Sequence, residues 1–350
     1  MAWEKLGTGS VTGTVANTSW KELDRVTLSG ANSTIDTGSF TAKDNIMILS
    51  YDLGHASAPS TNGAQQFNSD TGNNYASRHR VNSGGSNTVS SDDTICDTDN
   101  IAPTFNIQQF SNIANQEKLV IGQQVIQGTA GAGNAPSRVD NVGKWANTSN
   151  QVTSFQLKSD QNFNTGSEIV VLGYDNDEAD SGTNFWQELA SVTRTDSGST
   201  IESGNFAAKK YLMVEYCSIP ANNGFKGRWE FGHSNGTMDT GSNYSQRWQD
   251  NGGSDSTGTS EGNFYGYTND DDAIQHGRAF IINKADKEKL VIFEGSSGGS
   301  TTGAGNAPSR REVVAKWTNT SYQITNIRLN NQIAGGDAAS GSFIKVYGAD

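Results

Sequence analysis

Apolar and polar residues alternate along much of the chain, and this alternation predicts β-strands. Gln151–Leu157 and Tyr322–Leu329 show it most clearly. A strand with this pattern has one face on a core and the other in water. Ile46–Leu49 and Leu212–Val214 are apolar without such interruption, which predicts more fully buried strands. No segment of about twelve residues carries a 3.6-residue apolar stripe, so the pattern gives no sign of an amphipathic helix.

The chain is an internal duplication. The run Trp20–Leu23 returns 166 residues later as Trp186–Leu189. The longest identity, Gly-Ala-Gly-Asn-Ala-Pro-Ser-Arg, begins at Gly131 and again at Gly303. Two copies of one module of roughly 170 residues account for this pattern. We therefore predict four segments: an N-terminal extension (1–19), a first repeat (20–175), a short acidic linker (176–184) and a second repeat (185–350).

Each repeat is expected to hold about eight strands, bounded by Gly, Asn, Ser and Asp turns. Besides the segments above, the expected strands are Leu119–Val125, Arg138–Trp145, Ile169–Leu172 and Phe343–Tyr347. About eight short strands in a module of this size favour two packed sheets. The predicted fold class is therefore all-β, with two tandem homologous β-sandwich domains of jelly-roll-like type.

Composition and charge exclude several classes of partner. The 350 residues include 40 glycines and carry a formal net charge of −12. No run of Lys and Arg occurs, whereas a nucleic-acid binder shows a basic patch. No apolar stretch approaches the ~18 residues of a membrane-spanning helix, and the first residues lack the apolar region of a signal peptide. We therefore expect neither nucleic acid nor a membrane as a partner.

The two cysteines, Cys96 and Cys217, occupy different places in the two repeats. They are expected as free, partly buried thiols, and a Cys96–Cys217 bridge between the repeats stays open. No Cys/His spacing resembles a zinc site, and the four histidines are not at equivalent positions. Nothing in the sequence marks the positioned base of a catalytic triad.

Asp-Thr-Gly occurs once per repeat, at Asp70 and Asp239. Aspartic proteases take one such aspartate from each of two lobes, and the paired carboxylates share a proton. The flanking residues argue against that chemistry, because no buried hydrophobic strand precedes either aspartate. The competing interpretation is a turn, in which Asp accepts backbone N–H groups and Gly supplies a positive φ. The two-lobed protease is kept only as a remote alternative.

Three acidic clusters are candidates for calcium, which prefers several oxygen ligands from one loop. None matches an EF-hand loop, so solvated turns are the competing interpretation. Gly131–Pro136 is only superficially similar to a phosphate-binding glycine loop, since no Lys-Ser/Thr pair or helix follows it. We predict a structural turn there and no bound cofactor. The acidic clusters are Asp92, Asp93, Asp97 and Asp99; Asp175–Asp180; and Asp270–Asp272.

Trp145 and Trp317 stand at matched positions, each directly after a lysine. Exposed aromatic rings on a sandwich can stack on sugars, whereas a Trp at a strand end is commonly part of the core. Both interpretations stay open from the sequence. The candidate loop or ligand contacts are matched residues of the two repeats: Asp70, Tyr75, Arg78 and Trp145 in the first, and Asp239, Tyr244, Arg247 and Trp317 in the second.

The repeated text also carries a family resemblance. The residues that carry it are Phe67–Arg78, the pair Gly84–Gly85, Glu117–Val120, Asn134–Arg138, Lys144–Trp145 with the following Asn147–Ser149, and a closing Gly-Ser-x-Ile-x-Val-x-Gly that begins at Gly166 and at Gly341. Together they resemble modules in proteins of marine tailed phages and related environmental viruses. The resemblance implies virion structural proteins of β-sandwich type and transfers no catalytic residue. The second repeat departs from the pattern at Phe231–Ser234.

The expected function is that of a non-enzymatic virion structural protein, which decorates or cements a capsid or builds a tail or fibre appendage. Its expected partners are other virion proteins and further copies of itself. Its expected location is the virion, after assembly in the host cytoplasm. Two similar modules suit repeated positions on a lattice. The alternative is a receptor- or glycan-binding tail or fibre protein, which predicts exposed aromatic rings beside Asn and Asp on one loop rim.

Overall fold

The computed structural model describes residues 20–59, 62–95, 101–176, 184–233, 236–267, 272–299 and 303–350. Every regular element in these residues is a β-strand, which confirms the all-β class. Accordingly, no helix within the described ranges is long and apolar enough to cross a membrane. The strands form two sets, called here the first half (β1–β11) and the second half (β12–β25). The extension 1–19 and most of the linker lie outside the described residues.

The first half contains an eight-stranded and a three-stranded antiparallel sheet. The large sheet has the order β1-β11-β3-β7-β8-β9-β5-β6, and the small sheet has the order β2-β10-β4. The strands are β1 (Lys21–Thr27), β2 (Asn32–Asp36), β3 (Asn45–Asp52), β4 (Asn62–Phe67), β5 (Tyr75–Val81), β6 (Ser86–Asp92), β7 (Thr104–Ser111), β8 (Lys118–Ile126), β9 (Ser137–Trp145), β10 (Phe155–Phe163) and β11 (Glu168–Tyr174).

The second half repeats this topology strand for strand in its large sheet, whose order is β12-β25-β14-β20-β21-β22-β18-β19. Its small sheet is β13-β23-β16-β17, with a separate pair β15-β24. The strands are β12 (Gln187–Thr193), β13 (Thr200–Glu202), β14 (Tyr211–Ser218), β15 (Pro220–Ala221), β16 (Gly227–His233), β17 (Thr237–Met238), β18 (Tyr244–Asp250), β19 (Asp255–Glu261), β20 (Gln275–Ile282), β21 (Lys289–Ser297), β22 (Ser309–Trp317), β23 (Asn326–Asn331), β24 (Asp337–Ala338) and β25 (Phe343–Ala349).

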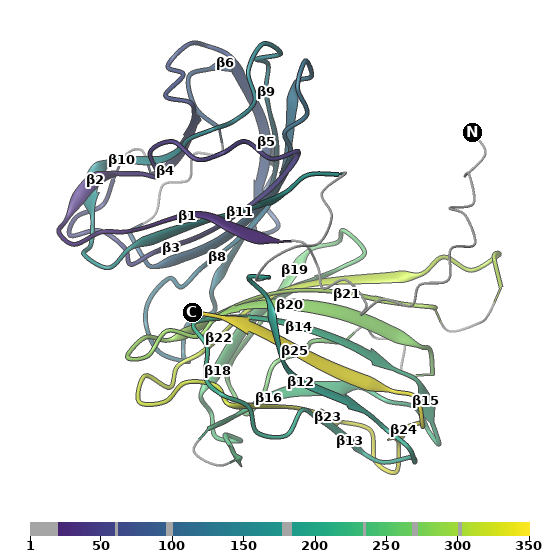
Figure 1. Ribbon diagram of the computed structural model, residues 1–350. Helices are drawn as coiled ribbons and strands as arrows, with labels where there is room; N and C mark the ends of the chain where they lie inside the picture. Colours follow the sequence, from purple (N-terminus) through teal and green to yellow (C-terminus); the bar gives the residue numbers. More distant parts are fainter. Residues whose placement is uncertain are drawn as a thin grey trace.

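The inner strands of the large sheets are covered on both faces, and successive residues of such a strand enter different cores. Ile46 and Ile48 of β3 share a core with Phe155 of the small sheet. Met47 and Leu49 point the opposite way and share a core with residues of the second half. One strand thus serves two cores because its side chains alternate between faces. The first half lies over the second (Figure 1), so the layers run small sheet, large sheet, large sheet, small sheet.

The structure has more strands than the eight expected per repeat, because polar strands complete the sheets. β6 and β19 lie at the edges of their large sheets and consist almost wholly of polar residues. Such a strand is held by backbone hydrogen bonds to one neighbour and has no apolar period for a pattern to detect. The two sheets of each half are therefore unequal in size, which the apolar segments alone did not predict.

The clearest alternating segments begin as strands later than expected. β10 begins at Phe155 rather than Gln151, and β23 is shortened in the same way. A side chain takes the place of a partner strand here, since Asn112 Oδ1 accepts the N–H of Val152 at 2.6 Å. The second half repeats this contact with an equivalent asparagine at 2.7 Å. The apolar residues before the strand are buried nonetheless, which is why the alternation extends beyond the sheet.

Candidate functional site

The candidate residues Asp70, Tyr75 and Trp145 meet at one end of the first half. Pairing of β5 with β9 places Tyr75 opposite Trp145, and Asp70 lies in the turn before β5. Trp145 Nε1 donates to Asp70 Oδ2 at 2.7 Å, and Gly72 N donates to Asp70 Oδ1 at 2.9 Å. Asn74 Nδ2 donates to the same carboxylate at 2.9 Å. The carboxylate therefore ties the turn to a core tryptophan.

The second half builds the same arrangement from its own residues. Trp317 Nε1 donates to Asp239 Oδ2 at 2.8 Å, and Gly241 N donates to Asp239 Oδ1 at 2.9 Å. Asn243 Nδ2 and the buried Tyr244 hydroxyl donate to the carboxylate and the carbonyl of the same aspartate, at 2.9 and 3.0 Å. Every hydrogen bond described for the two carboxylates stays within its own half. This arrangement is not the shared-proton pair of an aspartic protease.

The turn interpretation is right about aspartate and wrong about glycine. Positive φ angles occur at Asn68 (52°) and Ser69 (53°), whereas Gly72 has none. Gly72 instead leaves room for the side chains of the turn, because a Cβ there would lie 2.8 Å from Asn74 Nδ2 and 3.1 Å from Asp70 Oδ1. Burial raises the pKa of Asp70, but the hydrogen bonds to its carboxylate outweigh burial and lower the pKa overall. The group is an ionised acceptor, not a proton donor.

Trp145 and Trp317 are completely buried, so neither ring is available to stack on a sugar. A buried lysine covers each ring: Lys118 Nζ lies 6.0 Å from the Trp145 centroid, and Lys289 Nζ lies 5.7 Å from the Trp317 centroid. Lys289 Nζ also donates to two loop carbonyls at 2.7 and 2.9 Å. Burial lowers the pKa of Lys289 to about 8. The lysine of the repeated Glu-Lys-Leu sequence therefore packs in the core of each half.

The two matched arginines have different surroundings. Arg78 is exposed on the outer side of β5. Arg247 faces the first half, where its Nε donates to the carbonyl of Pro136 at 2.9 Å and its Nη1 lies 3.8 Å from Asp255 Oδ2. Residues that are equivalent in the sequence are therefore not equivalent in the structure.

The acidic clusters show no metal site within the part of the chain that the structure describes, since no three His, Cys, Asp or Glu side chains are grouped to hold an ion. Asp175 is ion-paired with Lys43 Nζ at 2.8 Å, and Asp350 makes the same contact with Lys209 at 2.6 Å. Asp97, Asp99, Asp270, Asp271 and 177–180 lie outside the described residues, so calcium at those loops stays a prediction.

The structure describes one of the two cysteines. Cys217 is a half-buried free thiol, and burial raises its pKa. Cys96 lies outside the described residues. The sequence prediction of a free, partly buried thiol is thus confirmed for Cys217.

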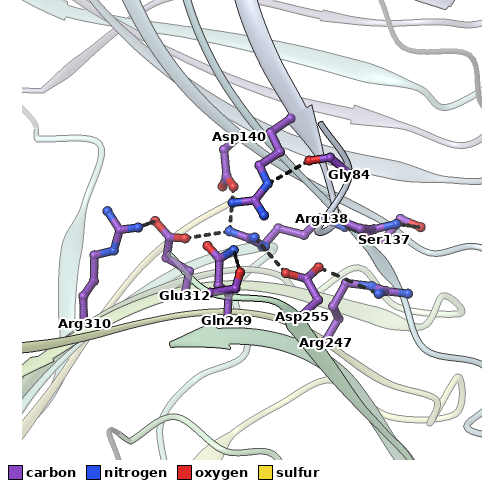
Figure 2. A network of polar contacts seen from close by, with 12 residues as sticks. Gly84, Ser137, Arg138, Asp140, Arg247, Gln249, Asp255, Arg310 and Glu312 are labelled. Atoms are coloured by element: carbon purple, nitrogen blue, oxygen red, sulfur yellow. Dashed lines mark hydrogen bonds and ion pairs between the residues drawn. The ribbon is translucent and has the colours of Figure 1, made fainter. Parts of the chain in front are cut away.

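A buried charged network between the halves escaped the sequence analysis. Arg138 of β9 lies among three carboxylates (Figure 2), with Nη1 2.6 Å from both Asp140 and Glu312 and Nη2 3.1 Å from Asp255. Glu312 and Asp255 belong to the second half. Burial raises the pKa of Asp140 to about 6, although the Arg138 charge opposes the rise. The guanidinium therefore neutralises carboxylates that would otherwise repel one another across the contact.

The glycine loop Gly131–Pro136 is also a contact between the halves. Its carbonyls accept hydrogen bonds from Ser245 Oγ, Arg247 Nε and Ser260 N, at 2.9, 2.9 and 2.8 Å. Its first N–H donates to Glu288 Oε1 at 2.6 Å. The loop is thus the structural turn expected from the sequence, and it also joins the two halves. The sequence gives one signal of this second role, which is that the loop recurs in both copies.

Glu168 connects the halves at another position. Its Oε1 accepts hydrogen bonds from Lys210 Nζ and the Tyr211 hydroxyl, each at 2.6 Å, and lies 3.2 Å from Arg25 Nη1. Burial raises the pKa of Glu168, but the hydrogen bonds from Lys210, Thr27 and Tyr211 outweigh burial and hold the pKa below its usual value. The buried carboxylate is therefore ionised at neutral pH.

We expect the contact between the halves to weaken in acid because of Glu168. A carboxyl with a lowered pKa in the folded state stabilises the protein above its unfolded pKa of 4.5, and this stabilisation is lost as the pH falls through the folded value. Glu168→Gln should remove that dependence and lower the free energy of unfolding at neutral pH by about 1–3 kcal/mol. Denaturant unfolding at about pH 7 and about pH 3.5 measures both effects. The exposed Glu188→Gln is the control, and a Glu168→Gln protein that behaves like this control would contradict the prediction.

The interior of the first half holds a polar cluster that the second half lacks. Gln108 and Asn141 are buried on either side of Gly122, and their amides have no hydrogen-bond partner among the described residues. The equivalent row in the second half is Ala279, Phe293 and Val313. Buried amides are normally paired, so this interior is suited to ordered water. The halves therefore share a topology but not an interior.

These contacts define a protein of two β-sandwiches stacked face to face. No protein-family model matches the chain, and no curated protein sequence matches it. Among solved structures, domains LG4–5 of the mouse laminin α1 chain are 10% identical with a TM-score of 0.20, covering 97% of this chain and 93% of that chain. Ail, the attachment invasion locus protein of Yersinia pestis, is 6% identical with a TM-score of 0.14, covering 79% of this chain and 99% of that chain. Similarities at this level say nothing about the function of this chain.

Proposed function

We propose that the chain is a non-enzymatic structural protein, a rigid two-module building block of a larger assembly. The observation that supports this most directly is the use of the repeated polar residues. Asp70 and Asp239 each hold a turn onto a buried tryptophan of their own half. Their hydrogen-bonding groups are thus occupied inside the protein, in the manner of structural supports rather than of groups that converge on a substrate.

Rigidity follows from the way the halves are joined. One hydrophobic cluster contains residues of both halves, among them Tyr51 and Phe105 from the first and Phe280 and Ile292 from the second. A large apolar contact between modules suppresses their relative motion. The Arg138 network adds charged contacts with a defined geometry. A subunit of fixed shape suits an assembly that repeats one geometry many times.

The assembly that we propose is a virion. This step rests on the resemblance of the repeated text to modules of tailed-phage proteins. In that setting the chain decorates or cements a capsid, or forms part of a tail or fibre, and its partners are other virion proteins and further copies of itself. The glycan-binding alternative is less well supported, because it needs exposed aromatic rings and Trp145 and Trp317 are buried.

Localising the chain in particles tests this function. We expect an antibody against the full chain to label purified particles at regular positions in immunogold electron microscopy. Mass spectrometry of the same particles should find the chain in a constant ratio to the major shell protein. A chain that is absent from purified particles, or is found only as free protein in the host lysate, would overturn the proposal.

A further inference from the structure

The contact between the halves is head-to-tail, because the two halves use different surfaces. The first half contributes its glycine loop with the following arginine, Gly131–Arg138, called here the donor loop. The second half contributes the outer face of β18, β21 and β22, called here the receiving face, which includes Arg247, Leu290, Ile292 and Val314. A head-to-tail contact between two copies of one module leaves one donor loop and one receiving face without a partner inside the chain.

The unused receiving face is on the first half, and the strand register identifies its residues. Ile121 pairs with Val142 across β8 and β9, as Ile292 pairs with Val314 across β21 and β22. The apolar residues of the two faces are identical in type and opposite in exposure. On the first half, Leu119 is 59% exposed, Ile121 is 68% exposed and Val142 is 50% exposed. On the second half, the equivalent Leu290, Ile292 and Val314 are buried, with exposures of 0%, 2% and 1%.

This exposed face has the shape and surroundings of a docking surface. It forms a shallow hollow of about 470 Å³ that also includes Arg78 and Lys144. These two residues are equivalent to Arg247 and Lys316, which bind backbone carbonyls of the first half in the contact inside the chain. Clustered apolar side chains of this kind on a surface mark an interaction site.

The unused donor loop is on the second half. Gly303–Arg310 repeats the text of Gly131–Arg138 without a change. Pro136 is buried against the second half, whereas the equivalent Pro308 is exposed. Both parts of a second head-to-tail contact are therefore present on the surface of one chain.

We propose that the exposed face of Leu119, Ile121 and Val142 binds the Gly303–Arg310 loop of a second copy of this chain. The contact inside the chain supplies the geometry: Arg78 Nε donates to the carbonyl of Pro308, as Arg247 Nε donates to that of Pro136 at 2.9 Å. This inference rests on the structural role proposed above and names its partner. Copies joined in this way form an open row or a closed ring, according to the rotation between them.

The contact between copies is weaker than the contact inside the chain, and the sequence shows why. Beside its donor loop, the first half presents Leu49, Ile107 and Val170 to the second half. The strand register places Glu215, Arg278 and Lys345 at the equivalent positions beside the second loop. Charged residues there replace apolar burial, so assembly is reversible and responds to salt.

Sedimentation velocity of the full chain over a range of concentrations tests the proposal. We expect the wild type to self-associate with increasing concentration. Ile121→Asp on the receiving face and Pro308→Asp on the donor loop should each weaken association by about tenfold or more. Ile101→Asp, which places the same charge at another exposed isoleucine, is the control and should associate like the wild type. Circular dichroism confirms that each variant is folded.

Mixing the two defective variants distinguishes the proposed contact from other modes of association. The Ile121→Asp protein keeps an intact donor loop, and the Pro308→Asp protein keeps an intact receiving face. An equimolar mixture should therefore form dimers at concentrations at which each variant alone is largely monomeric. A wild type that stays monomeric at about 1 mM, or a Pro308→Asp protein that self-associates as strongly as the wild type, would overturn the inference.

The outcome is separable from that of the proposed function. If the chain is present in particles and Ile121→Asp is incorporated as the wild type is, the structural role stands and this contact is rejected. If the chain self-associates as expected but is absent from particles, the contact stands and the virion role is rejected.

Discussion

Replacing Arg138 by alanine is expected to lower the free energy of unfolding by about 3–5 kcal/mol. The substitution removes the cation that contacts Asp140, Asp255 and Glu312 together, and the side chain of Asp255 is only 1% exposed. Asp255 and Glu312 would then keep only the longer contacts with Arg247 at 3.8 Å and Arg310 at 3.5 Å. Burial of a poorly paired charge costs several kcal/mol. Denaturant unfolding at neutral pH, followed by circular dichroism, measures the loss.

The second half supplies the matched control for this prediction. Arg310 is the equivalent of Arg138 in the repeated sequence and lies 3.5 Å from Glu312, but its side chain is 59% exposed whereas that of Arg138 is 2% exposed. An ion pair of so exposed a side chain contributes little to stability. Arg310→Ala should change the free energy of unfolding by no more than about 0.5 kcal/mol. The cost of Arg138→Ala should shrink as the pH falls below about 6, because Asp140, whose pKa is raised to about 6, then becomes protonated and no longer needs a cation. Equal effects of the two substitutions would show that the network does not bear on the stability of the contact.

Replacing Trp145 by alanine is expected to cost about 3–5 kcal/mol of stability, and Trp317→Ala is expected to cost the same. Both rings are completely buried, and both are held by an aspartate, at 2.7 and 2.8 Å. The effect is large because a cavity forms and because the aspartate loses its donor. Thermal and denaturant unfolding of the two variants provide the measurement.

The same experiment separates a core role of the tryptophans from a role in binding. Trp145→Phe keeps an aromatic ring in the core but removes the N–H donor and part of the indole, so we expect a smaller loss of about 1–3 kcal/mol. A surface platform for sugars would behave differently, since its removal would abolish glycan binding with little change in stability. Stability within about 0.5 kcal/mol of the wild type in both alanine variants would contradict the core role.

At the candidate site, the sequence allowed prediction of local contacts but not of long-range ones. The aspartates were correctly assigned to turns, because an Asp in a turn accepts the N–H of the residue two positions on, which is a local contact. Their partners could not be assigned, because Trp145 lies 75 residues after Asp70 and reaches it only through the pairing of β5 with β9. Arg138 was part of the longest identity, yet two of its three carboxylate partners lie 117 and 174 residues away. Contacts over such separations depend on topology, which a local pattern does not contain.

The fold, too, was predictable from the sequence only where the signal is local. Ile46–Leu49 was predicted to be more fully buried than the alternating segments, and it is, because the two faces of β3 serve two cores. β6 was missed because an edge strand of polar residues has no apolar face. Neither the unequal size of the sheets nor the stacking of the halves could be read from apolar spacing, because spacing reports the faces of a strand and not what covers them.

By itself, the sequence determined that this protein is built from strands and that its modules are two copies of one text, because alternation and repetition are properties of the chain read locally. Only the tertiary structure decided which residues of each copy are buried and which are exposed. Leu119 and Leu290 stand in the same Glu-Lys-Leu-Val-Ile run, yet the first is exposed and the second is buried. Burial depends on which surface packs against a strand, and here that surface belongs to the other half of the chain.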